Sequence, residues 1–142
     1  MDDRKSILAE FIQKTWNDGD VSAVPDFLAR RYTIHSDPGD PWEGQTLDIP
    51  GFQDRLVKSR AAAPDQRFEC VDMIAEGDRI AMTWRWSGTH LGDLPGLPAS
   101  GAPIRMTGIT VYYFQGNRLC GHWQNADRLS VYQQILAAGQ GA

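Results

Sequence analysis

The segment MTGITVYYFQGNRLCGHWQNAD, at residues 106–127, constrains the fold of this chain more than any other stretch. Its first half is rich in β-branched and aromatic residues, which favour strands, and a short turn at 115–117 separates it from a second extended run. The pattern predicts two long paired strands, with the first central in its sheet or covered on both faces. The second strand ends in a group of polar and reactive side chains: Cys120, His122, Trp123, Gln124, Asn125 and Asp127. A strand end that gathers imidazole, amide and carboxylate groups beside aromatic rings is typical of a binding or active site.

Composition narrows the class of protein. A chain of 142 residues with 42% hydrophobic and 23% charged residues is expected to form one domain, 1–142, with its own core. The formal net charge of −4 argues against nucleic acid and against an anionic membrane surface as partners, because both attract basic patches. No run approaches the roughly 18 apolar residues of a membrane span, and the acidic, amphipathic start is unlike a signal peptide.

The two cysteines, Cys70 and Cys120, have no spacing typical of a metal site. We expect them to be free, buried thiols in a reducing cytosol, with a disulfide as the alternative. The sequence therefore favours a cytoplasmic location.

The predicted elements run in the order helices, strands, helix. Apolar residues at helical spacing predict helices over 4–17, from a cap at Asp20 or Ser22 to about Arg30, from Pro50 to about Ala63, and over 128–138. The third of these is expected to bury a stripe of Phe52, Leu56, Val57 and Arg60. Strands are expected over 67–75 and 79–89, joined by a short turn and followed by the hairpin at 106–127.

Two further segments connect these elements. A short extended piece at 32–35 leads into SDPGDPWEG at 36–44, which is rich in turn-forming residues and is expected to be a loop. A second loop, at 90–103, carries several leucines and is expected to fold over a neighbouring surface. The whole pattern predicts an α+β fold: a cone-shaped, curled antiparallel sheet of about four to five strands, with N-terminal helices and a C-terminal helix enclosing an apolar pocket.

Three stretches also carry the motifs of a known family: FIQKTWNDGDVSAVPDFLARRYTIH, AEGDRIAMTWRWSGTHLGDLPGLPASGAPIRMTGITVYYFQGNRL and GHWQNADRLSVYQQIL. On these motifs the chain resembles the SnoaL-like polyketide cyclases, within the nuclear-transport-factor-2-like superfamily, over nearly its whole length. The GTHLG loop with its Pro/Gly-rich continuation and the terminal HWQNADRLSVYQQIL run are the most specific parts of the likeness. The resemblance implies a single SnoaL-like domain.

The resemblance also implies a reaction, a cofactor-free intramolecular aldol condensation. In the family a pocket carboxylate removes an acidified α-proton, and the resulting enolate attacks a carbonyl of the same substrate. That carboxylate aligns here with Gln124, and a pocket histidine of the family aligns with Thr110. Because an amide cannot act as a base, the sequence leaves open whether the chain is catalytic at all.

His122 and Asp127 are the candidate catalytic residues. His122 lies two positions before Gln124, so both should face the same side of the strand, and imidazole is the natural acid/base group near neutral pH. The alternative is a structural histidine. Asp127 is the nearest remaining carboxylate and, as a base, would need a pKa raised by burial. Its alternative role is the N-cap of the last helix.

Aromatic and polar side chains expected to face the pocket are the candidate substrate-binding residues: Trp16, His35, Trp84, Trp86, His90, Met106, Thr110, Tyr112 and Gln124. A tyrosine hydroxyl there could stabilise an enolate, and the indole rings could stack on a flat polycycle. Ordinary core packing is the alternative for each of them. The histidines lack metal-ligand spacing, so neither a metal nor another cofactor is expected.

Three functions remain open from the sequence. The first is a cyclase, isomerase or lyase acting on a small apolar or polycyclic carbonyl compound. The second is a non-catalytic protein that binds a small hydrophobic molecule. The third is an enzyme of the epoxide hydrolase type, which needs paired carboxylates and an arginine around one water and for which only Asp127 or Asp72 is available. The outer face of the sheet, with Val111, Tyr113 and Trp123, predicts a homodimer.

Overall fold

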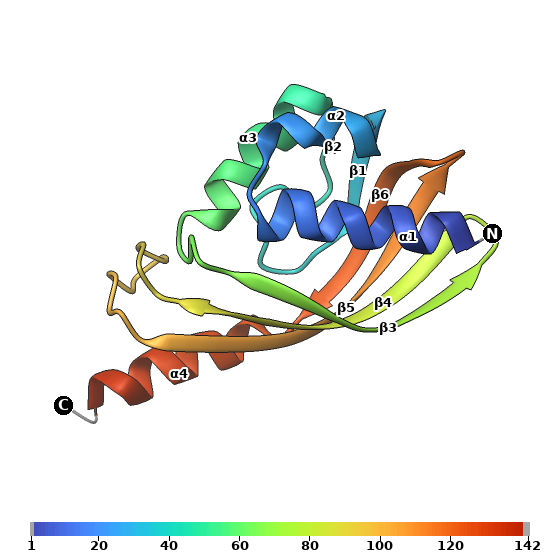
Figure 1. The fold of residues 1–142 in the computed structure, drawn as a ribbon. Helices are drawn as coiled ribbons and strands as arrows, with labels where there is room; N and C mark the ends of the chain where they lie inside the picture. Colours follow the sequence, from blue (N-terminus) through green and yellow to red (C-terminus); the bar gives the residue numbers. More distant parts are fainter. Residues whose placement is uncertain (1, 141–142) are drawn as a thin grey trace.

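A six-stranded sheet curls beneath the N-terminal helices in the computed structural model, which describes residues 2–140 (Figure 1). The strands are β1 (Leu28–Ser36), β2 (Thr46–Leu47), β3 (Arg67–Glu76), β4 (Arg79–Thr89), β5 (Pro103–Gln115) and β6 (Arg118–Ala126). They lie in the order β2-β1-β6-β5-β4-β3, and every pair is antiparallel except β1 with β6. The two edge strands do not pair with each other, so the sheet is curled but open.

The helical elements are α1 (Asp2–Phe11), the π-helical turn η1 (Ile12–Asn17), the 3₁₀ turn η2 (Val21–Ala23), α2 (Val24–Phe27), α3 (Ile49–Arg60) and α4 (Arg128–Gln140). Asp48 begins α3 as expected for an N-cap, since its side chain accepts a hydrogen bond of 2.8 Å from the backbone N–H of Gly51. The first three α-helices lie over the concave side of the sheet (Figure 1).

The predicted α+β fold with a curled sheet and flanking helices is confirmed, with several local corrections. The sheet has six strands rather than four to five, and it is mixed rather than purely antiparallel. The second helix ends at Phe27 instead of about Arg30, because Leu28 already pairs with Leu119 of β6. The third helix ends at Arg60 instead of about Ala63, and the last continues beyond residue 138 to the end of the described chain.

The core lies between the concave face of the sheet and the helices. Alternate side chains of β4 and β5 face inward, as strand periodicity requires, and pack against α1 and α3. Gly108 of β5 permits a close approach here, since a Cβ atom at this position would lie 2.2 Å from Cζ2 of Trp84. The indole ring of Trp84 therefore occupies the space that a side chain at position 108 would fill.

Helix α4 lies along β5 where β6 has ended. Strand β6 reaches only to Ala126, opposite Gly108, which leaves the first part of β5 without a strand on that side. The Gln134 side chain fills this place, because its Nε2 donates to the Arg105 carbonyl oxygen and its Oε1 accepts from the Arg105 N–H, both at 2.7 Å. The amide of Gln134 pairs with β5 as the backbone of a neighbouring strand would.

Two smaller expectations concern cysteines and membrane segments. Both cysteines are free thiols, but Cys70 is exposed and Cys120 is half-buried, so the expectation of burial was wrong. Within residues 2–140, no helix has both the length and the apolar character needed to cross a membrane.

Candidate active site

A cavity of about 400 Å³ lies on the concave side of the sheet, bordered by α3, α4 and the two long loops. Most of its lining is aromatic or aliphatic: Trp16, Tyr32, Pro41, Trp42, Ala61, Ala62, Phe68, Trp84, Trp86, Leu94, Pro95, Ile104, Met106, Tyr112, Val131 and Tyr132. Polar and charged groups gather in the rest of the lining, including His122, Gln124 and Arg128. The combination suits a molecule that is largely apolar and carries a few polar groups.

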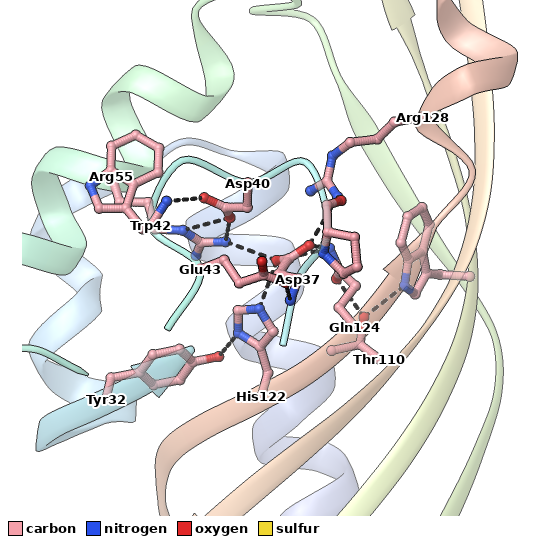
Figure 2. Close-up of polar contacts among 12 residues, drawn as sticks. Tyr32, Asp37, Asp40, Trp42, Glu43, Arg55, Thr110, His122, Gln124 and Arg128 are labelled. Atoms are coloured by element: carbon pink, nitrogen blue, oxygen red, sulfur yellow. Dashed lines mark hydrogen bonds and ion pairs between the residues drawn. The ribbon is translucent and has the colours of Figure 1, made fainter. Parts of the chain in front are cut away.

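Asp37 lies behind the polar side of this cavity, where it contacts His122, Gln124 and Arg128 of the lining (Figure 2). It follows directly on β1, and because Ile34 of β1 is paired with His122 of β6, the chain brings the carboxylate next to that imidazole. The Asp37 side chain is fully buried, and its Oδ2 lies 2.8 Å from Nε2 of His122. Its Oδ1 lies 3.2 Å from Nε2 of Gln124 and 3.0 Å from Nη1 of Arg128.

Arg55 links a second carboxylate, that of Asp40, to the carboxylate of Asp37. Nη2 of Arg55 lies 2.5 Å from Oδ2 of Asp40 and 3.5 Å from Oδ2 of Asp37. The Arg55 guanidinium also lies over the rings of Trp16 and Phe52, 5.4 and 5.6 Å from their centroids. With Arg128, the two carboxylates face two guanidinium groups, so the buried cluster is close to neutral in charge.

The charges around Asp37 and His122 settle their protonation at neutral pH. Burial alone would raise the pKa of Asp37, but the hydrogen bond from His122 and the nearby positive charges, Arg128 first, bring it below its ordinary value of 3.8. Burial lowers the pKa of His122 below 6.5, and Arg55 adds to this, although Asp37 opposes it. The pair therefore consists of an ionised carboxylate and a neutral imidazole.

Donor and acceptor types then fix the hydrogen positions on His122. Because the Asp37 carboxylate can only accept, Nε2 of His122 must carry the hydrogen. Nδ1 is then the acceptor and lies 2.7 Å from the hydroxyl oxygen of Tyr32, whose pKa burial raises well above its ordinary value. Tyr32 thus donates to His122, and His122 donates to Asp37. Tyr32 also lines the cavity.

Most of the predicted site residues come together around the cavity. The predicted residues in its lining are Trp16, Trp84, Trp86, Met106, Tyr112, His122 and Gln124. Thr110 is buried beside them, with its Oγ1 2.6 Å from Oε1 of Gln124. His122 and Gln124 face the same side of β6, as the strand periodicity predicted.

Two predicted histidines lie away from the cavity lining. His35 is exposed on the opposite face of β1, with its ring 4.9 Å from that of Tyr113, because strand alternation turns it away from its inward neighbours. His90 is buried where the 90–103 loop begins, and its Nδ1 lies 2.8 Å from Oγ of Ser100. Its Nε2 has no hydrogen-bond partner within residues 2–140.

Asp127 takes the alternative position that the sequence allowed, at the start of α4. It is exposed, and its Oδ1 accepts a hydrogen bond of 3.3 Å from the backbone N–H of Ser130. It borders a shallow hollow on the outer face of the sheet, not the cavity. Asp72 is also exposed and accepts from the N–H of Met73, so neither carboxylate named for a hydrolase lines the cavity.

The central residues Asp37, Asp40 and Arg55 were missed from the sequence, where 36–44 was read only as a loop. A usable signal was present. Arg55 lies three residues after Phe52 on the buried stripe of α3, where a lone arginine requires a carboxylate partner. The loop that follows β1 carries Asp37, Asp40 and Glu43, so the partner was close at hand.

Comparison with known proteins assigns the chain to a family. The model of the SnoaL-like polyketide cyclase family matches residues 6–135, and the chain therefore belongs to this family, as its motifs indicated. A candidate polyketide cyclase from Acidithiobacillus ferrooxidans is 49% identical in sequence, with a TM-score of 0.92, and the match covers 96% of each chain.

More distant structures share the fold. TsrD from Streptomyces laurentii is 22% identical, with a TM-score of 0.79 and 94% of each chain covered. IdmH, a candidate polyketide cyclase from Streptomyces antibioticus, is 24% identical with a TM-score of 0.77, covering 93% of this chain and 97% of its own. No curated protein matches the sequence.

Proposed function

We propose that this protein is a cofactor-free acid/base enzyme that acts on a largely apolar or polycyclic carbonyl compound, with intramolecular aldol cyclisation as its reaction. The observation that carries the proposal is the buried pair of Asp37 and His122, whose imidazole lines an aromatic cavity. An imidazole whose far nitrogen is held by a carboxylate is a general arrangement for proton transfer, because the carboxylate stabilises the imidazolium that forms.

The geometry supports a definite order of proton movements. A substrate carbonyl that accepts the Tyr32 hydroxyl proton in a hydrogen bond releases Nδ1 of His122, which then takes the substrate α-proton. Asp37 stabilises the imidazolium through Nε2–H, and the Tyr32 hydroxyl stabilises the enolate oxygen. The enolate carbon forms a bond to a second carbonyl carbon of the same substrate, and His122 returns the proton to the new alkoxide.

This arrangement also accounts for the amide at the family's carboxylate position. Gln124 stands where the resemblance places the carboxylate, and Asp37 supplies one 3.2 Å from its Nε2. The carboxylate that follows β1 thus lies next to the position on β6 at which the resemblance places the family's carboxylate. In this proposal His122 moves the proton, and Gln124 supports the carboxylate behind it.

The site can be tested before the natural substrate is known. Two- and three-ring aromatic ketones with α-hydrogens serve as probes, and NMR in D₂O follows exchange of those hydrogens. The wild-type protein is expected to accelerate exchange, and His122→Gln to reduce this acceleration by about 100-fold or more. Asp127→Asn is the matched control, because this exposed cap lies outside the cavity.

The alternative is a non-catalytic binder of the same class of molecule. One observation favours it: both ring nitrogens of His122 are engaged, and Asp37 is fully buried. Saturable quenching of tryptophan fluorescence by the ketones, without any accelerated exchange in the wild type, would support the binder and contradict the enzyme. We do not propose an epoxide hydrolase, because Asp37 is fully buried and outside the cavity lining, and the exposed Asp72 and Asp127 lie outside the cavity.

We also propose that the protein is a cytoplasmic homodimer. The outer face of the sheet supports the dimer, since Val71, Ile109 and Trp123 are 51%, 52% and 43% exposed on it. Two free thiols fit a reducing compartment.

A further inference from the structure

We infer that Thr110 is a positioning residue, which orients the Gln124 amide and through it holds the Asp37 carboxylate for His122. The three residues Trp84, Thr110 and Gln124 form a continuous chain of hydrogen bonds that ends on Asp37 (Figure 2). Nε1 of Trp84 lies 2.9 Å from Oγ1 of Thr110, and Oγ1 lies 2.6 Å from Oε1 of Gln124.

The direction of every hydrogen bond in this chain is fixed from its two ends. An indole N–H can only donate, so Thr110 accepts from Trp84 and has its single hydroxyl hydrogen left to donate. Because the Asp37 carboxylate can only accept, the Gln124 NH₂ group must face Asp37. The atom of Gln124 facing Thr110 is therefore the carbonyl oxygen, which accepts the Thr110 hydroxyl hydrogen. The side-chain amide has one orientation that satisfies both neighbours.

Three of the four side chains in this hydrogen-bond chain are buried, and Gln124, which lines the cavity, is half-buried. Thr110 and the Asp37 side chain are fully buried, and Trp84 is 2% exposed, with its ring held in the space above Gly108. The strands supply the alignment, because Thr110 is paired with Gln124 across β5 and β6. A hydrogen bond from a buried hydroxyl such as that of Thr110 favours one rotamer of its partner, which is what a positioning role requires.

Loss of the Thr110 hydroxyl has a definite consequence at His122. Without it the Gln124 oxygen has no donor, and the amide turns away from Asp37 or presents its oxygen to the carboxylate. Asp37 then has one donor fewer and attracts the proton on His122 more strongly. The imidazolium form becomes easier to reach, so less neutral His122 is present at a given pH.

The test compares two substitutions at one position. Thr110→Val removes the hydroxyl with little change in shape, and Thr110→Ser keeps it. NMR of ¹⁵N-labelled histidines follows the titration of His122, identified by its absence in His122→Gln among the three histidines of the chain. We expect a higher His122 pKa in Thr110→Val and a wild-type titration in Thr110→Ser. The same pKa in all three proteins would overturn the inference.

A second variant covers the case in which Thr110→Val fails to fold. Trp84→Phe removes the donor at the start of the chain and is expected to move the His122 titration in the same direction. Trp86→Phe is its control for this NMR signal, since within residues 2–140 no hydrogen bond joins the Trp86 side chain to Thr110, Gln124 or Asp37. Unchanged titration in Trp84→Phe, or an equal change in Trp86→Phe, contradicts the assignment.

The role of Thr110 in catalysis rests on the proposed function. Measuring hydrogen exchange of the ketones distinguishes a failure of this inference from a failure of the proposed function. If Thr110 positions the site, Thr110→Val should catalyse ketone exchange at least several-fold more slowly than the wild type, with the same dissociation constant for the ketone. Thr110→Ser should exchange at the wild-type rate. A shifted His122 titration in a protein that never accelerates exchange upholds the positioning role and refutes the enzyme. Slower exchange with an unshifted titration refutes the positioning role alone.

Discussion

Asp37→Asn is the substitution for which the structure makes the strongest statement. The Asp37 carboxylate faces hydrogen-bond donors only, from His122, Gln124, Arg55 and Arg128. An asparagine has the same shape but must turn its NH₂ group toward donors in either orientation. It also leaves the buried guanidinium of Arg55 and the partly exposed one of Arg128 short of one negative charge. Removing one partner of a buried charge pair typically costs about 3–5 kcal/mol.

That cost converts to a melting temperature. For a domain of this length, about 1 kcal/mol corresponds to roughly 3 °C, so Asp37→Asn should melt about 10–15 °C below the wild type at neutral pH. Thermal unfolding followed by circular dichroism measures this, with Asp127→Asn as the control. Asparagine caps helices as well as aspartate does, so the control should stay within about 2 °C. A drop of less than about 3 °C in Asp37→Asn refutes the view that the cluster depends on this carboxylate.

Three other outcomes are expected. Burial lowers the pKa of His122 in the folded protein, so below about pH 6.5 the unfolded chain binds more protons than the folded one. The stability that His122 contributes by staying neutral is therefore present above that pH. It is lost as the pH falls through the lower pKa of the folded state. The His122→Gln variant should not show this loss of stability at low pH. If the melting temperatures of the wild type and the variant differ by the same amount from about pH 7.5 to 5, this expectation is wrong. Gly108→Ala should destabilise the protein by about 1–3 kcal/mol and alter the near-ultraviolet dichroism, because the new methyl group meets Trp84. Gly139→Ala, with open space around it, should be neutral or stabilising by up to about 1 kcal/mol, and equal losses in both variants refute the steric argument. Light scattering should find a dimer that Trp123→Arg dissociates, whereas a monomeric wild type contradicts the proposed interface.

Local patterns predicted most of the fold. The alternation of Ile80, Met82, Trp84 and Trp86 along β4 identifies a strand with one buried face, and all four are buried. Pairing of distant segments is not visible in such patterns. The parallel pairing of β1 with β6 joins residues about ninety positions apart, and it explains why the strand at Leu28 was assigned to a helix.

The candidate site shows the same division between local and distant information. His122 and Gln124 were found because they lie on one face of one strand. Asp37 lies in a segment whose composition indicates only a turn, and its importance comes from partners on β6, α3 and α4. The buried stripe of α3 was also misread, since Val57 is 57% exposed and Arg55 is buried in its place. Hydrophobicity alone predicts that Val57 is buried and Arg55 is exposed. The carboxylates that pair with Arg55 make its burial favourable instead.

The pairing of Gln134 with β5 bears on how the protein limits the addition of further strands to its sheet. An uncovered strand edge presents alternating N–H and C=O groups on which another chain can add a strand, and this is a common start of aggregation. Gln134 satisfies both backbone groups of Arg105 at the edge that β6 leaves open. The last helix thus covers this part of the β5 edge against the addition of a strand.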